Sequence, residues 1–124
     1  MTKLRVLLIE DDATMLSLLR TLLRIEGYEV VPLENDRNAE AILETIRIER
    51  PDIILLDVHL RQVNGLDVLQ AIRQDESICQ TAVIMSSGAD FGQRCLEMGA
   101  NAFLLKPFMP DDLLRKMREF VGEP

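Results

Sequence analysis

Short, nearly continuous runs of apolar residues recur along the chain, and each is followed by a stretch with apolar residues three or four positions apart. The clearest runs cover residues 4–9, 53–56, 82–86 and 102–105. Such runs are too short for a buried helix and indicate strands that are covered on both faces. The pattern therefore predicts buried strands that alternate with longer amphipathic segments.

The segments between the runs have the spacing of amphipathic helices. Gly27 and Gly99 end two of them in the way that helix C-terminal caps do, and Pro110 suits the first turn of the last one. The apolar positions that predict buried helix faces are Leu16, Leu19 and Leu23; Ala39, Ile42, Leu43 and Ile46; Val68, Leu69 and Ile72; Phe91, Cys95 and Met98; and Leu113, Met117 and Phe120.

One further strand completes the pattern. Residues 28–32 read "YEVVP", and Pro32 cannot donate a hydrogen bond to a neighbouring strand, which marks this strand as an edge. Five strands that alternate with five helices indicate βαβ units. The sequence thus predicts one α/β domain with a parallel five-stranded sheet between two layers of helices.

Composition narrows the class of protein. The 124 residues carry a formal net charge of −7, so binding of nucleic acid by this domain itself is not expected. Cys79 and Cys95 are too few for a disulfide framework and predict reduced, partly buried thiols in a cytoplasmic protein. No apolar run approaches the roughly 20 residues of a membrane span, and the N-terminus lacks the cleavage site of a signal peptide.

Polar residues follow four of the five predicted strands. In a parallel α/β sheet, ligands bind beyond the carboxyl ends of the strands, so these residues are expected at one edge of the sheet. They are Glu10, Asp11 and Asp12 after the first strand, Asp57 after the third, Ser87 after the fourth, and Lys106 after the fifth.

Most of these residues also have an ordinary structural explanation. Asp11 or Asp12 could cap the following helix, Ser87 could serve a turn, and Lys106 could be a solvated loop lysine. Asp57 is different, because a carboxylate that adjoins a buried strand needs a counter-charge or a metal ion. Their occurrence together on one edge favours a functional site.

The residue types at this edge favour magnesium-assisted phosphoryl transfer. Several carboxylates in one crevice repel one another unless a cation lies between them, and oxygen ligands suit Mg²⁺. A lysine opposite them can neutralise a phosphoryl group, and a serine hydroxyl can bind one of its oxygens. Asp57 is the expected nucleophile, because it ends the central strand and no cysteine or histidine is placed to compete with it.

The sequence resembles the receiver domain of response regulators in two-component signalling over residues 3–121. The matching motifs are "VLLIEDD", "PDIILLDVHL", "VIMSSGAD" and "GANAFLLKPF", in that order. The resemblance implies a flavodoxin-like (βα)5 sandwich with the strand order 2-1-3-4-5. It also implies a single receiver domain over residues 1–124.

The resemblance assigns roles to the residues at the strand ends. Asp57 would accept a phosphoryl group from a kinase phosphohistidine, and Lys106 would pair with the phosphoaspartate. Ser87 and Phe103 would be the switch residues, and the Lys106–Pro107 peptide bond would be cis. Mg²⁺, or Mn²⁺, would be bound by Asp57, by Asp11 directly, by Glu10 through water and by the backbone carbonyl of His59.

Three positions depart from the family pattern or lie where the family tunes the lifetime of the phosphate. The family usually has proline four residues after the phosphoacceptor, where this chain has Arg61, so a more flexible loop is expected, with a guanidinium that could reach the phosphoryl group or an acid of the kinase. His59 and Ala89 lie at positions that tune the lifetime of the phosphate. Phosphate carriage by His59 itself is not expected, because its place after a strand is wrong for that role.

The resemblance implies a switch and not an enzyme that acts on other substrates. Phosphorylation of Asp57 would alter the surface of the fourth helix, fifth strand and fifth helix, and with it affinity for an output partner or a second copy. The kinase or phosphotransfer partner and the output are not identified by the sequence. The alternatives are a receiver-like interaction module that needs no phosphorylation, a flavin-binding protein, which the acids of "EDDAT" disfavour, and an aspartyl phosphatase, which would need a second acid where His59 stands.

Overall fold

Five parallel strands form one sheet in the order β2-β1-β3-β4-β5 in the computed structural model, which describes residues 3–124. The strands are β1 (Arg5–Ile9), β2 (Glu29–Val31), β3 (Ile53–Asp57), β4 (Ala82–Ser87) and β5 (Ala102–Leu105). The helices are α1 (Ala13–Ile25), α2 (Ala39–Glu49), α3 (Gly65–Gln74), α4 (Gly92–Glu97) and α5 (Pro110–Val121). The predicted flavodoxin-like (βα)5 architecture and its strand order are confirmed.

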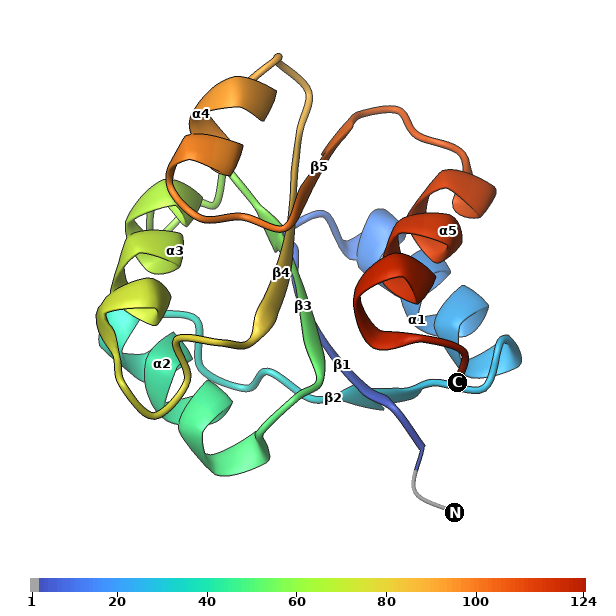
Figure 1. Cartoon of the computed structure of the whole chain (residues 1–124), viewed down its shortest axis with the longest axis horizontal. Coiled ribbons are helices and arrows are strands. Elements are labelled where there is room, and N and C mark those ends of the chain that lie inside the picture. Colours follow the sequence, from blue (N-terminus) through green and yellow to red (C-terminus); the bar gives the residue numbers. More distant parts are fainter. Residues whose placement is uncertain (1–2) are drawn as a thin grey trace.

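Helices cover both faces of the sheet, so the strands are buried on both sides as their apolar runs predict. Helices α1 and α5 lie on one face, and α2, α3 and α4 lie on the other (Figure 1). Within the described residues, strand β2 pairs only with β1 and lies at the edge, and Pro32 follows its last residue. All five residues of β3 are buried, including Asp57.

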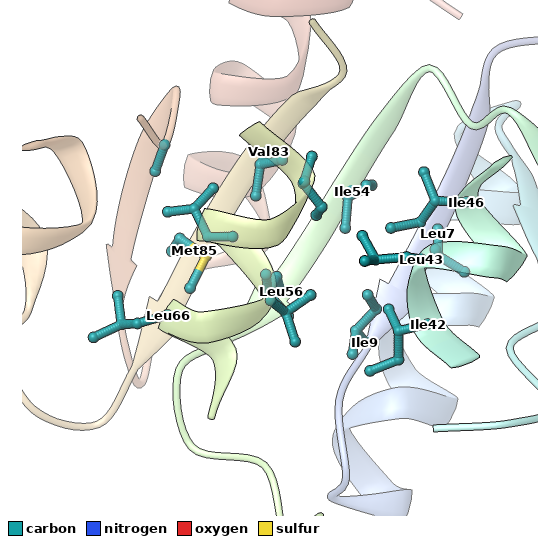
Figure 2. Close-up of a cluster of buried hydrophobic side chains, with 14 of the residues drawn as sticks. Leu7, Ile9, Ile42, Leu43, Ile46, Ile54, Leu56, Leu66, Val83 and Met85 are labelled. Atoms are coloured by element: carbon teal, nitrogen blue, oxygen red, sulfur yellow. The ribbon is translucent and has the colours of Figure 1, made fainter. Parts of the chain in front are cut away.

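The two helical layers enclose separate apolar clusters, because successive strand residues point to opposite faces. In β1, Leu7 and Ile9 join the cluster under α2 and α3, whereas Val6 and Leu8 join the cluster under α1 and α5. Figure 2 shows the first cluster, with side chains from three strands facing those of the helices: Leu7, Ile9, Ile54, Leu56, Val83 and Met85 against Ile42, Leu43, Ile46 and Leu66. This packing fixes the strand ends that carry the polar residues.

Most of the residues that the sequence predicts to cap helices lie at helix ends in the structure. The side chain of Asp12 accepts a hydrogen bond from Met15 N over 2.9 Å, so Asp12 caps α1, whereas Asp11 does not. Gly27 follows the end of α1 with φ of 99°, a conformation that favours glycine. Both cysteines are free thiols, Cys95 buried and Cys79 half-buried.

The prediction that Phe120 lies in the core is wrong. Phe120 is 39% exposed, whereas Leu113 and Met117 on the same helix are buried. Val121, four residues after Met117, packs on the core at the last turn of α5, and this leaves Phe120 turned toward solvent. Among residues 3–124, no helix has both the length and the apolar character of a membrane span.

Candidate functional site

Three strand ends bring an ion-pair cluster together at the carboxyl edge of the sheet. Lys106, after β5, places its Nζ 2.6 Å from Glu10 Oε1, after β1, and 2.9 Å from Asp57 Oδ2, at the end of β3. The Glu10 and Asp57 side chains are only 7% and 9% exposed. The carboxylate that ends the buried strand therefore has a counter-charge, supplied from almost fifty residues away in the sequence.

The cluster shifts the protonation of the lysine. Burial alone would lower the pKa of Lys106, but the hydrogen bonds and negative charges of Glu10 and Asp57 outweigh burial and raise it above its ordinary value of 10.5. Lys106 is therefore a permanent cation at neutral pH. A permanent cation suits the recognition of a phosphoryl group or another anion at this place.

The remaining acid of the pair after β1 is held differently. Asp11 does not contact Lys106; its Oδ2 accepts a hydrogen bond from the backbone N–H of Arg61, in the loop between β3 and α3. Glu10, Asp11 and Asp57 thus place three carboxylates at this edge of the sheet against the single ammonium of Lys106. The excess of negative charge favours a cation there.

Ser87, the last residue of β4, forms no hydrogen bond with Asp57 within residues 3–124. Its side chain is fully buried, and its Oγ accepts a hydrogen bond from Ala89 N over 3.1 Å. Its backbone carbonyl accepts from Lys106 N over 2.8 Å, which fixes the backbone of the lysine. The Lys106–Pro107 peptide bond that follows is cis.

Three aromatic side chains lie on β5 or in the loops that follow β3 and β4. The ring of His59, which is exposed, packs edge-on against Phe91, with 5.2 Å between ring centroids and 71° between ring planes. The backbone N–H of His59 donates to Asp57 Oδ1 over 3.3 Å. On β5, the half-buried ring of Phe103 lies against the first residue of α4, since a Cβ added to Gly92 would be 3.2 Å from Phe103 Cδ2.

The oxygen donors at this edge of the sheet are of the kind that Mg²⁺ binds. Within residues 3–124, no three His, Cys, Asp or Glu side chains converge closely enough to hold a metal ion by themselves. Mg²⁺ is usually bound through one or two carboxylates and keeps several waters, so Asp11 and Asp57, with the backbone carbonyl of His59, suffice as candidate ligands.

Sequence reasoning missed one residue that shapes the site. The backbone of Gly65 lies so close to the end of β3 that an added Cβ would be 2.1 Å from the carbonyl oxygen of Asp57. Its N–H donates to Val58 O over 2.8 Å. A glycine eight residues after the predicted nucleophile, at the start of a helix, was the available signal.

Known proteins of similar sequence are response regulators. The family model of the response regulator receiver domain matches residues 6–118. The transcriptional regulatory protein CpxR of Escherichia coli (strain K12) is 36% identical over 120 residues, a match that covers 94% of this chain and 49% of CpxR. The DNA-binding response regulator MtrA of Mycobacterium tuberculosis is 33% identical over 116 residues, with 92% and 49% covered. This chain therefore spans about half the length of these relatives.

Solved structures of similar proteins superpose on nearly the whole chain. The receiver domain of the sensor histidine kinase PA1611 from Pseudomonas aeruginosa PAO1, which has a magnesium ion coordinated in its active-site cleft, gives a TM-score of 0.84 at 27% identity and covers 98% of this chain and 100% of its own. A putative response regulator from Chloroflexus aurantiacus gives 0.86 at 27% identity with the same coverage. By sequence and by fold, the chain belongs to the response regulator receiver domain family of two-component systems.

Proposed function

We propose that this receiver domain, with its core at residues 3–121, accepts a phosphoryl group on Asp57 from a phosphohistidine of a sensor kinase or phosphotransfer domain. The observation that carries this proposal is the cluster in which Lys106 Nζ lies 2.6 Å from Glu10 Oε1 and 2.9 Å from Asp57 Oδ2. A carboxylate that only had to be neutralised would need no second and third acid beside it. An excess of carboxylates around one lysine suits a metal-assisted acceptor of an anionic group.

The residues of the cluster have distinct roles in the proposed transfer. An oxygen of Asp57 attacks phosphorus, the P–N bond to the donor imidazole breaks, and the imidazole nitrogen keeps the electron pair and takes a proton. Lys106 neutralises charge on the transferred phosphoryl group, and the N–H of His59 helps to orient the Asp57 carboxylate. Asp11, Asp57 and the carbonyl of His59, with Glu10 acting through water, would hold Mg²⁺ or Mn²⁺, which supplies further positive charge for the phosphoryl oxygens.

The consequence of phosphorylation is proposed to be a change of surface and not turnover of another substrate. The Ser87 hydroxyl leaves Ala89 N for a phosphoryl oxygen, and the Phe103 ring changes its packing against Gly92 at the start of α4. The face formed by α4, β5 and α5 then changes its affinity for an output domain, an output protein or a second copy of the chain. The acidic composition still argues against direct nucleic-acid binding by these 124 residues, although the longer relative MtrA is named as DNA-binding.

Phosphorylation by a small phosphodonor tests the proposal. We expect that incubation with acetyl phosphate and Mg²⁺ adds one phosphoryl group to the intact mass, and that Asp57→Asn or chelation of the metal abolishes the adduct. Beryllofluoride, which mimics a phosphoryl group on aspartate, should bind to the wild type and not to Asp57→Asn. If neither an adduct nor beryllofluoride binding is found, the domain is an interaction module that works without phosphorylation.

His59 is expected to lengthen the life of the phosphoaspartate. Its ring packs against that of Phe91, its backbone N–H donates to Asp57 Oδ1, and such an aromatic pair is worth about 1 kcal/mol. If the pair shields the acyl phosphate from water, His59→Ala should raise the dephosphorylation rate about fivefold. The decay of the phosphorylated mass over time measures the rate, with Phe91→Ala and the double variant as controls. An unchanged rate in His59→Ala would contradict the role, as would additive effects in the double variant.

A further inference from the structure

The base of the loop between β3 and α3 is held by backbone hydrogen bonds. Gly65 N donates to Val58 O over 2.8 Å, and His59 pairs with Asn64 as an isolated antiparallel bridge. The side chain of Asn64 also caps α3 by accepting from Leu66 N over 2.8 Å. Because the base is fixed by these contacts, the position of the tip, residues 60–63, depends on what the tip itself contacts.

One hydrogen bond joins this tip to the opposite loop of the site. The backbone N–H of Arg61 donates to Asp11 Oδ2, across fifty positions in the sequence. In the part of the chain that the structure describes, this is the only hydrogen bond that the Asp11 carboxylate accepts, since Lys106 pairs with Glu10 and Asp57 instead. The orientation of Asp11 therefore rests on a main-chain donor and not on a charged partner.

We propose that the main-chain N–H of Arg61 is a positioning group for the Asp11 carboxylate, and that through it the loop between β3 and α3 sets the affinity of the site for a divalent cation. The bond holds Oδ2 and leaves Oδ1 without a donor among residues 3–124, so the carboxylate is oriented before the cation binds. A free acid in an exposed loop would first have to lose its rotamer freedom. The inference rests on the proposed magnesium site.

The inference concerns the backbone N–H of Arg61 and not its guanidinium, and the two groups need separate variants. The guanidinium is exposed and contributes a positive charge near the site, whereas the N–H belongs to the backbone and is present in every residue except proline. Arg61→Ala removes the charge and keeps the N–H. Arg61→Pro removes both and also fixes φ, so the two variants differ in the donor and in that backbone restriction, while the exchange experiment below tests the donor without proline.

Calorimetric titration with MgCl₂ tests the effect on the cation. Loss of a group that orients a metal ligand typically costs 10- to 100-fold in metal affinity, so we expect Arg61→Pro to bind Mg²⁺ about tenfold more weakly than Arg61→Ala. Far-UV circular dichroism confirms that both variants are folded. Equal affinities of the two folded variants would overturn the inference, while a wild type that binds no Mg²⁺ would overturn the proposed function and with it the metal-related role of Arg61.

A second measurement tests the hydrogen bond itself in the metal-free protein and needs no proline. In the presence of a chelator, the backbone amide of Arg61 should exchange with solvent deuterium roughly tenfold faster in Asp11→Ala than in the wild type, because its acceptor is gone. The amide of Leu66, which donates to Asn64 Oδ1, is the internal control and should not change. Equal exchange of the Arg61 amide in both proteins would overturn the inference even if Mg²⁺ binds normally.

Discussion

We expect that replacing Gly65 with alanine lowers the free energy of unfolding by about 3 kcal/mol, because the position has no room for a methyl group. An ideal Cβ at Gly65 would be 2.1 Å from the carbonyl oxygen of Asp57 and 2.8 Å from Val58 Cα. Both atoms belong to the backbone at the end of β3, which is paired with β4 and buried on both faces. Relief of the clash therefore requires a shift of the strand or of the whole first turn of α3.

Urea unfolding of Gly65→Ala, followed by circular dichroism, measures this loss, and Gly88→Ala is the matched control. Gly88 is exposed and has no atom within 4 Å of an added Cβ, so its variant should stay within about 0.5 kcal/mol of the wild type. The strained segment includes Asp57, so Gly65→Ala should also weaken binding of beryllofluoride. Similar unfolding free energies for the two variants would show that the end of β3 can shift at little cost in free energy.

The order of strands and helices along the chain could be predicted from the sequence, because strands that are buried on both faces need apolar residues at successive positions. A strand such as residues 53–56 must be apolar at every position, and this separates it from an amphipathic helix. The general place of the site follows from the same logic, since the carboxyl ends of parallel strands share one edge. Both inferences depend on residue type alone.

The contacts within the site could not be predicted in this way, because they depend on side-chain conformation and on backbone groups. Residue type does not reveal that Lys106 pairs with Glu10 and not with Asp11. The Ser87 hydroxyl accepts from Ala89 N, and no sequence pattern distinguishes this from a contact with Asp57. Arg61 donates to Asp11 through its backbone N–H, and the residue type at position 61 does not predict such a contact.

The wrong prediction for Phe120 has a related cause. A spacing of three and four continues to the end of α5, but the cluster beneath the helix is filled by Leu113, Leu114 and Met117, with Val121 at the last turn. Helical periodicity predicts a face only within the tolerance of one residue, and the packing of the neighbouring elements decides which residue fills it.

Lys106 is expected to stabilise the protein even without phosphate or metal. We expect Lys106→Met to lower the free energy of unfolding at pH 7 by about 2 kcal/mol, because it leaves the Glu10 and Asp57 carboxylates facing each other without a counter-charge. This loss is below that of a fully buried pair because the lysine side chain is 22% exposed. Saturating Mg²⁺ should restore more stability to the variant than to the wild type if a cation can replace the ammonium.

The pH dependence of this loss distinguishes a charge effect from a packing effect. The pKa of Lys106 is raised in the folded protein above its ordinary 10.5, so the contribution of its charge is fully present below pH 10.5 and is lost as the pH rises through the folded pKa. The difference in unfolding free energy between wild type and Lys106→Met should therefore stay constant from pH 7 to about 10 and shrink above that. Lys116→Met, on α5, is the control, since Lys116 forms no salt bridge with any other residue in 3–124 and its loss should cost less than about 0.5 kcal/mol. A difference that persists unchanged at high pH would mean that Lys106 stabilises the fold through its methylene chain, and the electrostatic account of the site would then be wrong.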